Sequence, residues 1–242
     1  LIPQPADLIV SNINLPLSTQ LGDSITASYT IKNAGSNVAV GKLTDAVYLS
    51  RDTVLNTLNA ALLGTAANNI LLQPGADTSY SITNPVESVS PDDYFGIART
   101  NILNTIVETN TDNNTRTSDA VITVGVRSLL LNIPAKTSLP TGVKRYYQIQ
   151  VGSGLDLLVN LTSNNSVSLN EFYIAYNRVP TPNDYDAKGN VAQQANQYLI
   201  VPGTKSGNYY LLVTSSYGAG SQEVTLLAKA LPFSLTSVNP GR

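Results

Sequence analysis

Five oxygen-bearing side chains lie within one short segment near the middle of the chain: Glu108, Asn110, Asp112, Asn113 and Asn114. Calcium is bound by about six to eight oxygens from carboxylates, amides and backbone carbonyls, so this composition suits it. The spacing does not match an EF-hand loop, which needs a glycine and a terminal glutamate. The segment predicts either a calcium site built on Glu108, Asn110, Asp112 and Asn114, or an Asx-rich turn whose side chains bond their own backbone.

Groups able to catalyse a reaction are scarce. The sequence has no His and no Cys, which excludes Ser-His-Asp and Cys-His arrangements. It also lacks a Ser-x-x-Lys motif and a Gly-x-Ser-x-Gly elbow. A glycosidase uses two carboxyl groups held at a fixed separation. The sequence has two pairs of acids close together, Asp92 with Asp93 and Asp184 with Asp186, but nothing else in it points to such a site. Because both pairs sit among turn residues, we interpret them as solvated acids and predict that the chain is not an enzyme.

The composition excludes several partner classes. Charged residues make up 12% of the chain, against about 25% in an average globular protein. The net charge is −2 and no run of Lys or Arg occurs, so we expect no nucleic-acid partner. No apolar stretch approaches the ~20 residues that span a bilayer, so we expect no membrane span. The chain begins Leu1-Ile2-Pro3 and contains no Met, which indicates a processed product or a piece of a longer protein.

Apolar and polar residues alternate with a period of two along most of the chain, as in half-buried strands. Ile25, Ala27, Tyr29 and Ile31 share one face of such a segment. We predict strands over 25–31, 46–49, 78–82, 94–98 and 120–124, and again over 128–131, 145–151, 155–161, 172–176, 198–201, 208–213 and 224–228. The segment 52–63 is interpreted as a loop that leads into a short strand. Strands at such intervals, separated by Asx, Gly and Pro turns, predict an all-β chain of sandwiches.

The alternation restarts near Arg127, which predicts two tandem β-sandwiches joined by a short link. The domains are expected at 1–126 and 127–232, and 233–242 is interpreted as the start of a further domain or a connecting strand. Adjacent tyrosines occur at 146–147 and at 209–210. One ring of each pair is expected to point inward and the other outward. The outward rings would serve cross-strand packing, a sugar-stacking platform or a domain contact.

Ordered motifs in the first half resemble the CARDB family, the cell-adhesion-related domain of bacteria. They are Ala6–Val10, Gly22–Ile25, Tyr29–Gly35, Tyr48–Asp52, Leu72–Gly75 and Val107–Asn114. The resemblance covers roughly residues 5–126 and implies an immunoglobulin-like sandwich. CARDB domains usually carry a second acid in the loop after the Ser-x-Asp motif, where this chain has Asn59. That departure counts against an ion site in the loop.

The second half resembles the bacterial pre-peptidase C-terminal (PPC) domain, a smaller sandwich of the jelly-roll kind. The resemblance rests on Tyr146–Ile149, Glu171–Tyr173 and Ser206–Val213, and Glu171 departs from the family's Asp. Pro180-Thr181 and Tyr185-Asp186 resemble a subtype found in large, repeat-built bacterial surface proteins. Some PPC-type domains bind calcium at acids near the sandwich edge. The resemblance therefore implies a second calcium site at Glu171, Asp184 and Asp186, with structural roles for Tyr185 and Asp186 as the alternative.

Together these resemblances imply a non-catalytic structural or adhesive module of a large secreted or cell-surface bacterial protein. It would form part of a stalk or an extracellular filament, with neighbouring domains of the same polypeptide or identical subunits as partners. A filament would donate a strand from Leu1–Val10 or Leu231–Val238 to a sheet edge. The alternative is an accessory module of a secreted hydrolase that binds polysaccharide or protein. No cofactor is required in either case, apart from calcium at the two candidate sites.

Overall fold

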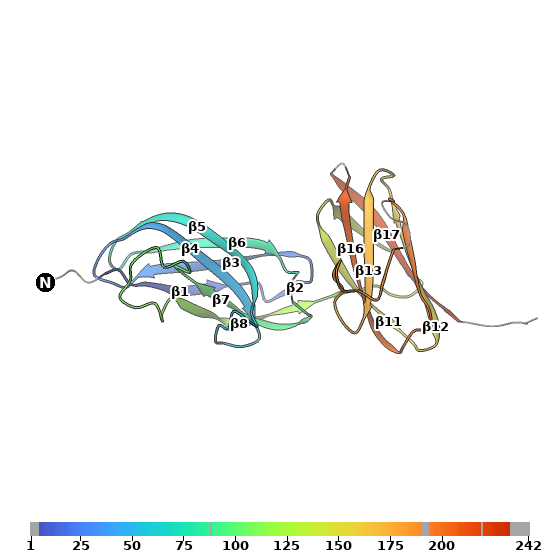
Figure 1. Ribbon diagram of the computed structural model, residues 1–242, viewed down its shortest axis with the longest axis horizontal. Coiled ribbons are helices and arrows are strands. Elements are labelled where there is room, and N and C mark those ends of the chain that lie inside the picture. The colour runs from blue at the N-terminus through green and yellow to red at the C-terminus, as the bar shows by residue number, and fades with distance from the viewer. Residues whose placement is uncertain (1–4, 88, 190–193, 219, 233–242) are drawn as a thin grey trace, which may run out of the picture. The chain divides into compact units, whose positions relative to one another are not determined.

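The computed structural model describes residues 5–87, 89–189, 194–218 and 220–232. The chain divides into two compact units, residues 1–125 and 126–242. Every regular element among the described residues is a β-strand (Figure 1), which confirms the prediction of an all-β chain. No helix in the described part is long and apolar enough to cross a membrane. The segment 233–242, which the sequence assigns to a further domain or connecting strand, lies outside the described residues.

The first unit is a sandwich of two sheets. Its strands are β1 (Leu8–Asn14), β2 (Ser18–Gln20), β3 (Ser24–Asn33), β4 (Ala39–Ser50), β5 (Ala61–Leu72), β6 (Asp77–Pro85), β7 (Asp92–Arg99) and β8 (Thr115–Gly125). One sheet has the order β1-β3-β6 and the other β2-β8-β7-β4-β5. Alternate residues of β3 are buried, including Ile25, Ala27, Tyr29 and Ile31, as the period-two pattern predicts.

The chain changes sheets soon after it enters the first unit. β1 pairs antiparallel with β3, and β2, which follows three residues later, pairs parallel with β8 in the other sheet. Leu15 lies in this crossover with its side chain over Gly96 of β7. A Cβ at Gly96 would lie 2.0 Å from the Leu15 Cδ1, so any other residue there would force the Leu15 side chain to move. After the crossover, β2 lies beside β8, the last strand of the unit.

The second unit is also a two-sheet sandwich. Its strands are β9 (Arg127–Ser128), β10 (Ala135–Pro140), β11 (Lys144–Val151), β12 (Leu155–Ser163), β13 (Leu169–Tyr176), β14 (Ala187–Lys188), β15 (Gln197–Val201), β16 (Gly207–Tyr217) and β17 (Ser221–Pro232). The sheets have the orders β10-β17-β12-β15 and β14-β13-β16-β11-β9.

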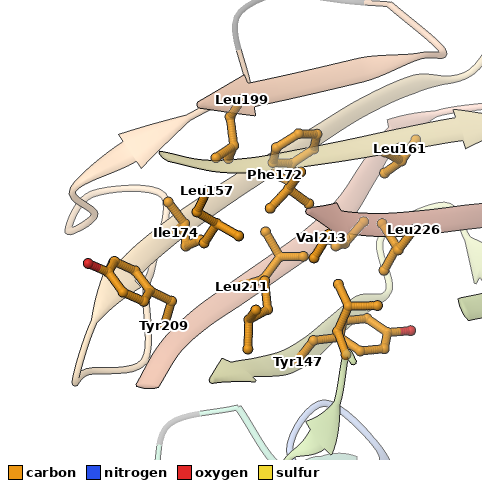
Figure 2. Close-up of a cluster of buried hydrophobic side chains, with 14 of the residues drawn as sticks. Tyr147, Leu157, Leu161, Phe172, Ile174, Leu199, Tyr209, Leu211, Val213 and Leu226 are labelled. Atoms are coloured by element: carbon orange, nitrogen blue, oxygen red, sulfur yellow. The ribbon is translucent and has the colours of Figure 1, made fainter. Parts of the chain in front are cut away.

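Apolar side chains from both sheets of the second unit meet between them (Figure 2). Leu157, Leu199 and Leu226 come from one sheet, and Phe172 and Leu211 come from the other. Their burial supplies the main driving force for folding of this unit, at about 25 cal/mol per Å² of apolar surface removed from water. Tyr147 and Tyr209 point into the same core, so neither ring is free to bind a ligand.

The tyrosine pairs depart from one sequence-based expectation. Tyr210 is half-buried, as an outward member would be, but Tyr146 is buried like its neighbour Tyr147. Tyr146 therefore offers no exposed ring on which a sugar could stack. Alternation fixes which side of a strand a ring occupies, but whether that side is covered depends on the rest of the fold.

The strands predicted from the sequence pattern leave out β1, β2, β10 and β14. β5 is a twelve-residue strand where only a short one was expected, and β10 was not expected at all. Both lie at sheet edges. Edge strands bury few residues, here Leu63, Ile70 and Leu72 on β5 and Leu139 on β10, so their alternation is weak. The segment predicted as a strand over 128–131 is instead the short β9 and a single bridge from Leu131 to Ala228.

Candidate functional site

Glu108 lies in the loop between β7 and β8, and its carboxylate is occupied by N–H donors. Its Oε2 accepts the backbone N–H of Leu8 at 2.6 Å. Its Oε1 accepts the side-chain amides of Asn101 at 2.5 Å and Asn114 at 2.9 Å. The backbone N–H of Thr109 also donates to the carbonyl of Ala6. Charge-assisted bonds of this kind are stronger than neutral ones, so Glu108 fastens the first strand of the unit to this loop.

The other oxygen-bearing residues of the loop do not converge on Glu108. Asn110 accepts the backbone N–H of Asp112 through its Oδ1 at 3.0 Å, which is an Asx turn. Asp112 is exposed, and Asn113 donates its amide to Asp7 Oδ1 at 3.0 Å. Buried Asn114 presents its amide nitrogen, not its oxygen, to Glu108. The geometry favours the structural-turn interpretation, and calcium binding at Glu108, Asn110, Asp112 and Asn114 stays a prediction.

The second predicted calcium site is organised around an arginine. The guanidinium Nη2 of Arg178 lies 2.9 Å from Asp184 Oδ1 and 2.8 Å from Asp186 Oδ1. These bonds hold the pKa of both carboxyls below the ordinary value. Asp186 also accepts the backbone N–H of Tyr176 at 2.7 Å and so ties together the two ends of the loop between them. This contact fits the structural role that the sequence offered as the alternative to calcium binding. Sequence reasoning missed Arg178, although an arginine six and eight residues before the two acids was a visible signal.

Glu171 lies apart from that pair and bonds a neighbouring tyrosine. Its Oε2 accepts the Tyr173 hydroxyl at 2.8 Å. Burial, helped by the hydrogen bond to Glu171, raises the pKa of Tyr173 to about 12. The structure therefore brings Asp184 and Asp186 together but gives Glu171 a different partner. Among the described residues, no group of three or more acidic side chains is close enough to hold a metal ion.

Asp45 is a buried acid that the sequence reasoning overlooked. It lies on β4 with no exposed surface, in the inward register of Leu43 and Val47. Its Oδ1 accepts Thr100 Oγ1 at 2.7 Å and the backbone N–H of Asn101 at 3.2 Å, and its Oδ2 accepts the Tyr29 hydroxyl at 3.2 Å. Burial raises its pKa above the ordinary 3.8, against the three hydrogen bonds, which lower it. An Asp in phase with apolar core positions was the available signal.

Replacing Asp45 by Asn is expected to change how the stability of the first unit depends on pH. Because the folded-state pKa of Asp45 is raised, the folded protein binds this proton more tightly than the unfolded chain does. That contribution to stability is fully present below pH 3.8 and is lost as the pH rises through the folded-state value. Asn carries no charge, so Asp45→Asn should gain stability relative to the parent between pH 4 and pH 7. Denaturant unfolding at both pH values measures this, and a difference that does not vary with pH would contradict it.

A neutral groove lies on the outer face of one sheet in the second unit. It has a volume of about 530 Å³. The register places Tyr198 of β15, Asn160 of β12 and Leu227 of β17 in one row across three strands. Thr162 and Thr225 form the next row. Within the described part of the chain, the side chains of Asn160, Thr162 and Thr225 make no hydrogen bond. The lining consists of Pro134, Asn160, Leu161, Thr162, Asn196, Gln197, Tyr198, Thr225 and Leu227, none of them charged.

Three solved structures resemble parts of the chain. The CARDB domain of a Pyrococcus furiosus protein, in complex with di-metal ions, is 22% identical and covers 51% of this chain and 92% of its own, with a TM-score of 0.37. The pre-peptidase C-terminal domain of a Bacillus anthracis collagenase is 22% identical and covers 43% and 94%, with a TM-score of 0.36. A domain of a putative cell surface protein from Methanosarcina acetivorans is 18% identical and covers 50% and 92%, with a TM-score of 0.37.

The sequence comparisons address the first unit. A search of curated proteins finds no match to the chain. The CARDB family model matches residues 5–118. The matched segment contains the motifs from Ala6–Val10 to Val107–Asn114 and the sandwich strands that they form. Over residues 5–118, just under half of the chain, the sequence is therefore similar to the CARDB family.

Proposed function

We propose that this chain is a non-catalytic structural module of an adhesive, secreted or cell-surface bacterial protein, in which the two sandwiches form part of a stalk. The observation that carries the proposal is the CARDB match over residues 5–118, because that family is adhesion-related. A stalk needs rigid modules joined in series, and each unit here has its own two-sheet core. The partners of such a module are the neighbouring domains of its own polypeptide.

The engagement of the acidic side chains supports this role. Glu108 binds the first strand, Asp45 bonds across the core of the first unit, and Arg178 neutralises Asp184 and Asp186 in the second. Each of these carboxylates is thereby engaged by groups of its own unit instead of facing a substrate. Acids used as a catalytic pair need distinct environments that push their pKa values apart, whereas Asp184 and Asp186 share one cation and shift the same way.

The described strands favour a stalk over a filament built by strand donation. Leu8–Val10, part of one candidate donor segment, lies in β1 and pairs with β3 of its own unit. Leu231, at the start of the other, pairs with Asp156 of β12. Residues 1–4 and 233–238 of the two candidate donor segments lie outside the described residues.

The stalk proposal predicts that spacing, not surface identity, is what the segment contributes. In the parent bacterial protein, deletion of these residues should weaken adhesion of cells to their substratum. Replacement by two unrelated sandwiches of equal length should restore it. Surface labelling with an antibody against the segment, on intact cells, checks its location. If the replacement fails to restore adhesion while the labelled protein reaches the surface, the segment itself binds something and the spacer role is wrong.

The neutral groove favours a second candidate, binding of an uncharged polysaccharide. Tyr198, 43% exposed, offers a ring on which a sugar could stack, and the Asn160 amide and the Thr225 hydroxyl beside it have free hydrogen-bonding capacity. A lining without charge matches a ligand whose polar groups are hydroxyls. The same adhesion assay tests this candidate: Tyr198→Ala should reproduce the loss caused by deletion, whereas the stalk proposal expects no effect.

A further inference from the structure

The strand β5 ends its sheet, and one side of its backbone has no partner strand among the described residues. It lies beside β4 alone, at the end of the order β2-β8-β7-β4-β5 (Figure 1). A bulge interrupts the pairing near Leu63, whose carbonyl accepts the side-chain amide of Asn84 at 3.0 Å. From Gly64 to Leu71 the pairing with β4 is regular. Along this stretch, alternate backbone N–H and C=O groups point away from the sheet, where a further strand could bond to them.

β5 lacks the features that keep the other sheet edges of the described chain from pairing with further strands. Proteins protect such edges with short strands, charged side chains, Pro or bulges. β2, β9, β14 and β15 have only two to five residues, and β1 carries a bulge. β6 contains Asp77 and Pro85, and β10 contains Lys136 and Pro140. β5 has twelve residues with neither a charge nor a Pro, and its bulge lies near one end.

The side chains of β5 suit a second copy of the same strand. Leu62 and Leu71, near its two ends, are 52% and 68% exposed. The exposed residues between them, Thr65, Ala67 and Asn69, are small or polar. Two copies paired antiparallel about a two-fold axis near Ala67 would bring Leu62 of each copy toward Leu71 of the other. Such pairing covers apolar surface at both ends and sets no like charges on β5 opposite each other.

We propose that two copies of this chain associate through β5, which pairs antiparallel with its counterpart and joins five strands from each copy into one continuous sheet. Backbone bonds between the copies supply the affinity, and the leucines at the two ends favour one register. A two-fold pair uses the open edge of both copies, so the assembly closes as a dimer. The inference goes beyond the stalk proposal, which concerns a single polypeptide.

Sedimentation velocity of the whole chain over a range of concentrations tests the proposal. We expect the parent to pass from monomer to dimer as the concentration rises, without larger species. Ala67→Lys places two positive charges beside each other at the axis and should weaken dimerisation by roughly tenfold, because like charges on paired strands repel. The side chain of Ala67 is exposed in the single chain, so the variant should keep the far-ultraviolet circular dichroism of the parent.

An exchange of charge provides the matched test. Ala67→Glu alone should weaken dimerisation as Ala67→Lys does. An equimolar mixture of the two variants should form a mixed dimer, because Lys and Glu then lie beside each other. Ser81→Lys adds the same charge on the exposed face of β6 in the other sheet, and it should dimerise like the parent.

Four results would each overturn the proposal: a parent that stays monomeric, assembly beyond the dimer, a dimer that Ala67→Lys leaves intact, or a mixture of the Lys and Glu variants that does not dimerise. The adhesion assay of the stalk does not depend on any of them, so the two proposals can fail separately.

Discussion

Replacing Glu108 by Ala is expected to destabilise the first unit by about 3 kcal/mol, since it leaves three N–H donors without their charged acceptor. The donors are the backbone of Leu8 and the side chains of Asn101 and Asn114. Asn101 and Asn114 are almost fully buried, so water cannot readily replace the lost bonds. For a unit of this size the melting temperature should fall by roughly 10 °C. Hydrogen exchange followed by mass spectrometry, resolved by peptide, would show the loss in the first unit.

A second acid in the same loop is the matched control. Asp112 is exposed, and its side chain makes no hydrogen bond among the described residues, so Asp112→Ala should change stability by less than about 0.5 kcal/mol. Both variants should be compared in calcium and in chelator. We expect the parent to melt at the same temperature in each. A melting temperature that rises with calcium in the parent, and no longer does so in Asp112→Ala, would restore the calcium hypothesis for this loop.

Replacing Asn170 by Ala is expected to destabilise the second unit by about 3 kcal/mol, through lost hydrogen bonds and a small cavity. Asn170 on β13 has no exposed surface, and its side-chain amide forms two hydrogen bonds with that of Gln222 on β17. Asn170 Oδ1 accepts from Gln222 Nε2 at 2.7 Å, and Asn170 Nδ2 donates to Gln222 Oε1 at 3.1 Å. It also donates to the carbonyl of Ala195 at 2.7 Å. This amide pair joins the two sheets of the sandwich. Its loss leaves the Ala195 carbonyl without the Asn170 donor, and it leaves the Gln222 amide with only Ser163 and Ser215 as side-chain partners.

A double-mutant cycle tests whether the amide pair acts as a unit. Asn170→Leu and Gln222→Met replace the amides by apolar groups of similar shape. Each single variant should destabilise because it removes a buried hydrogen-bond partner from the other amide. The double variant should lose less than the sum of the two, with a coupling of about 1–2 kcal/mol, since the bonds between the two amides are lost only once. Denaturant unfolding of all four proteins supplies the values, and strict additivity would show that the two amides contribute independently.

The contrast between Asp112 and Glu108 shows where sequence reasoning stops. Both are acids within one Asx-rich segment, and the spacing gave them equal standing as calcium ligands. In the folded unit Glu108 binds Leu8, a hundred residues earlier in the chain, and Asp112 faces solvent. A partner at that separation leaves no local pattern. By contrast, Asp45 in phase with Leu43 and Val47 was readable in principle, because strand periodicity alone places it in the core.

The amino-acid sequence by itself determined the all-β class, the central strands and the CARDB relationship, because alternation and turn residues act over a few neighbouring positions. Ile25–Ile31 is an example: its apolar face is written in consecutive residues and needs only a second sheet to cover it. The tertiary structure alone decided which donor each carboxylate binds and which strands far apart in the sequence become neighbours. The parallel contact of β2 with β8 joins residues about a hundred positions apart. Such contacts arise from closure of the whole sandwich, so no short stretch of sequence specifies them.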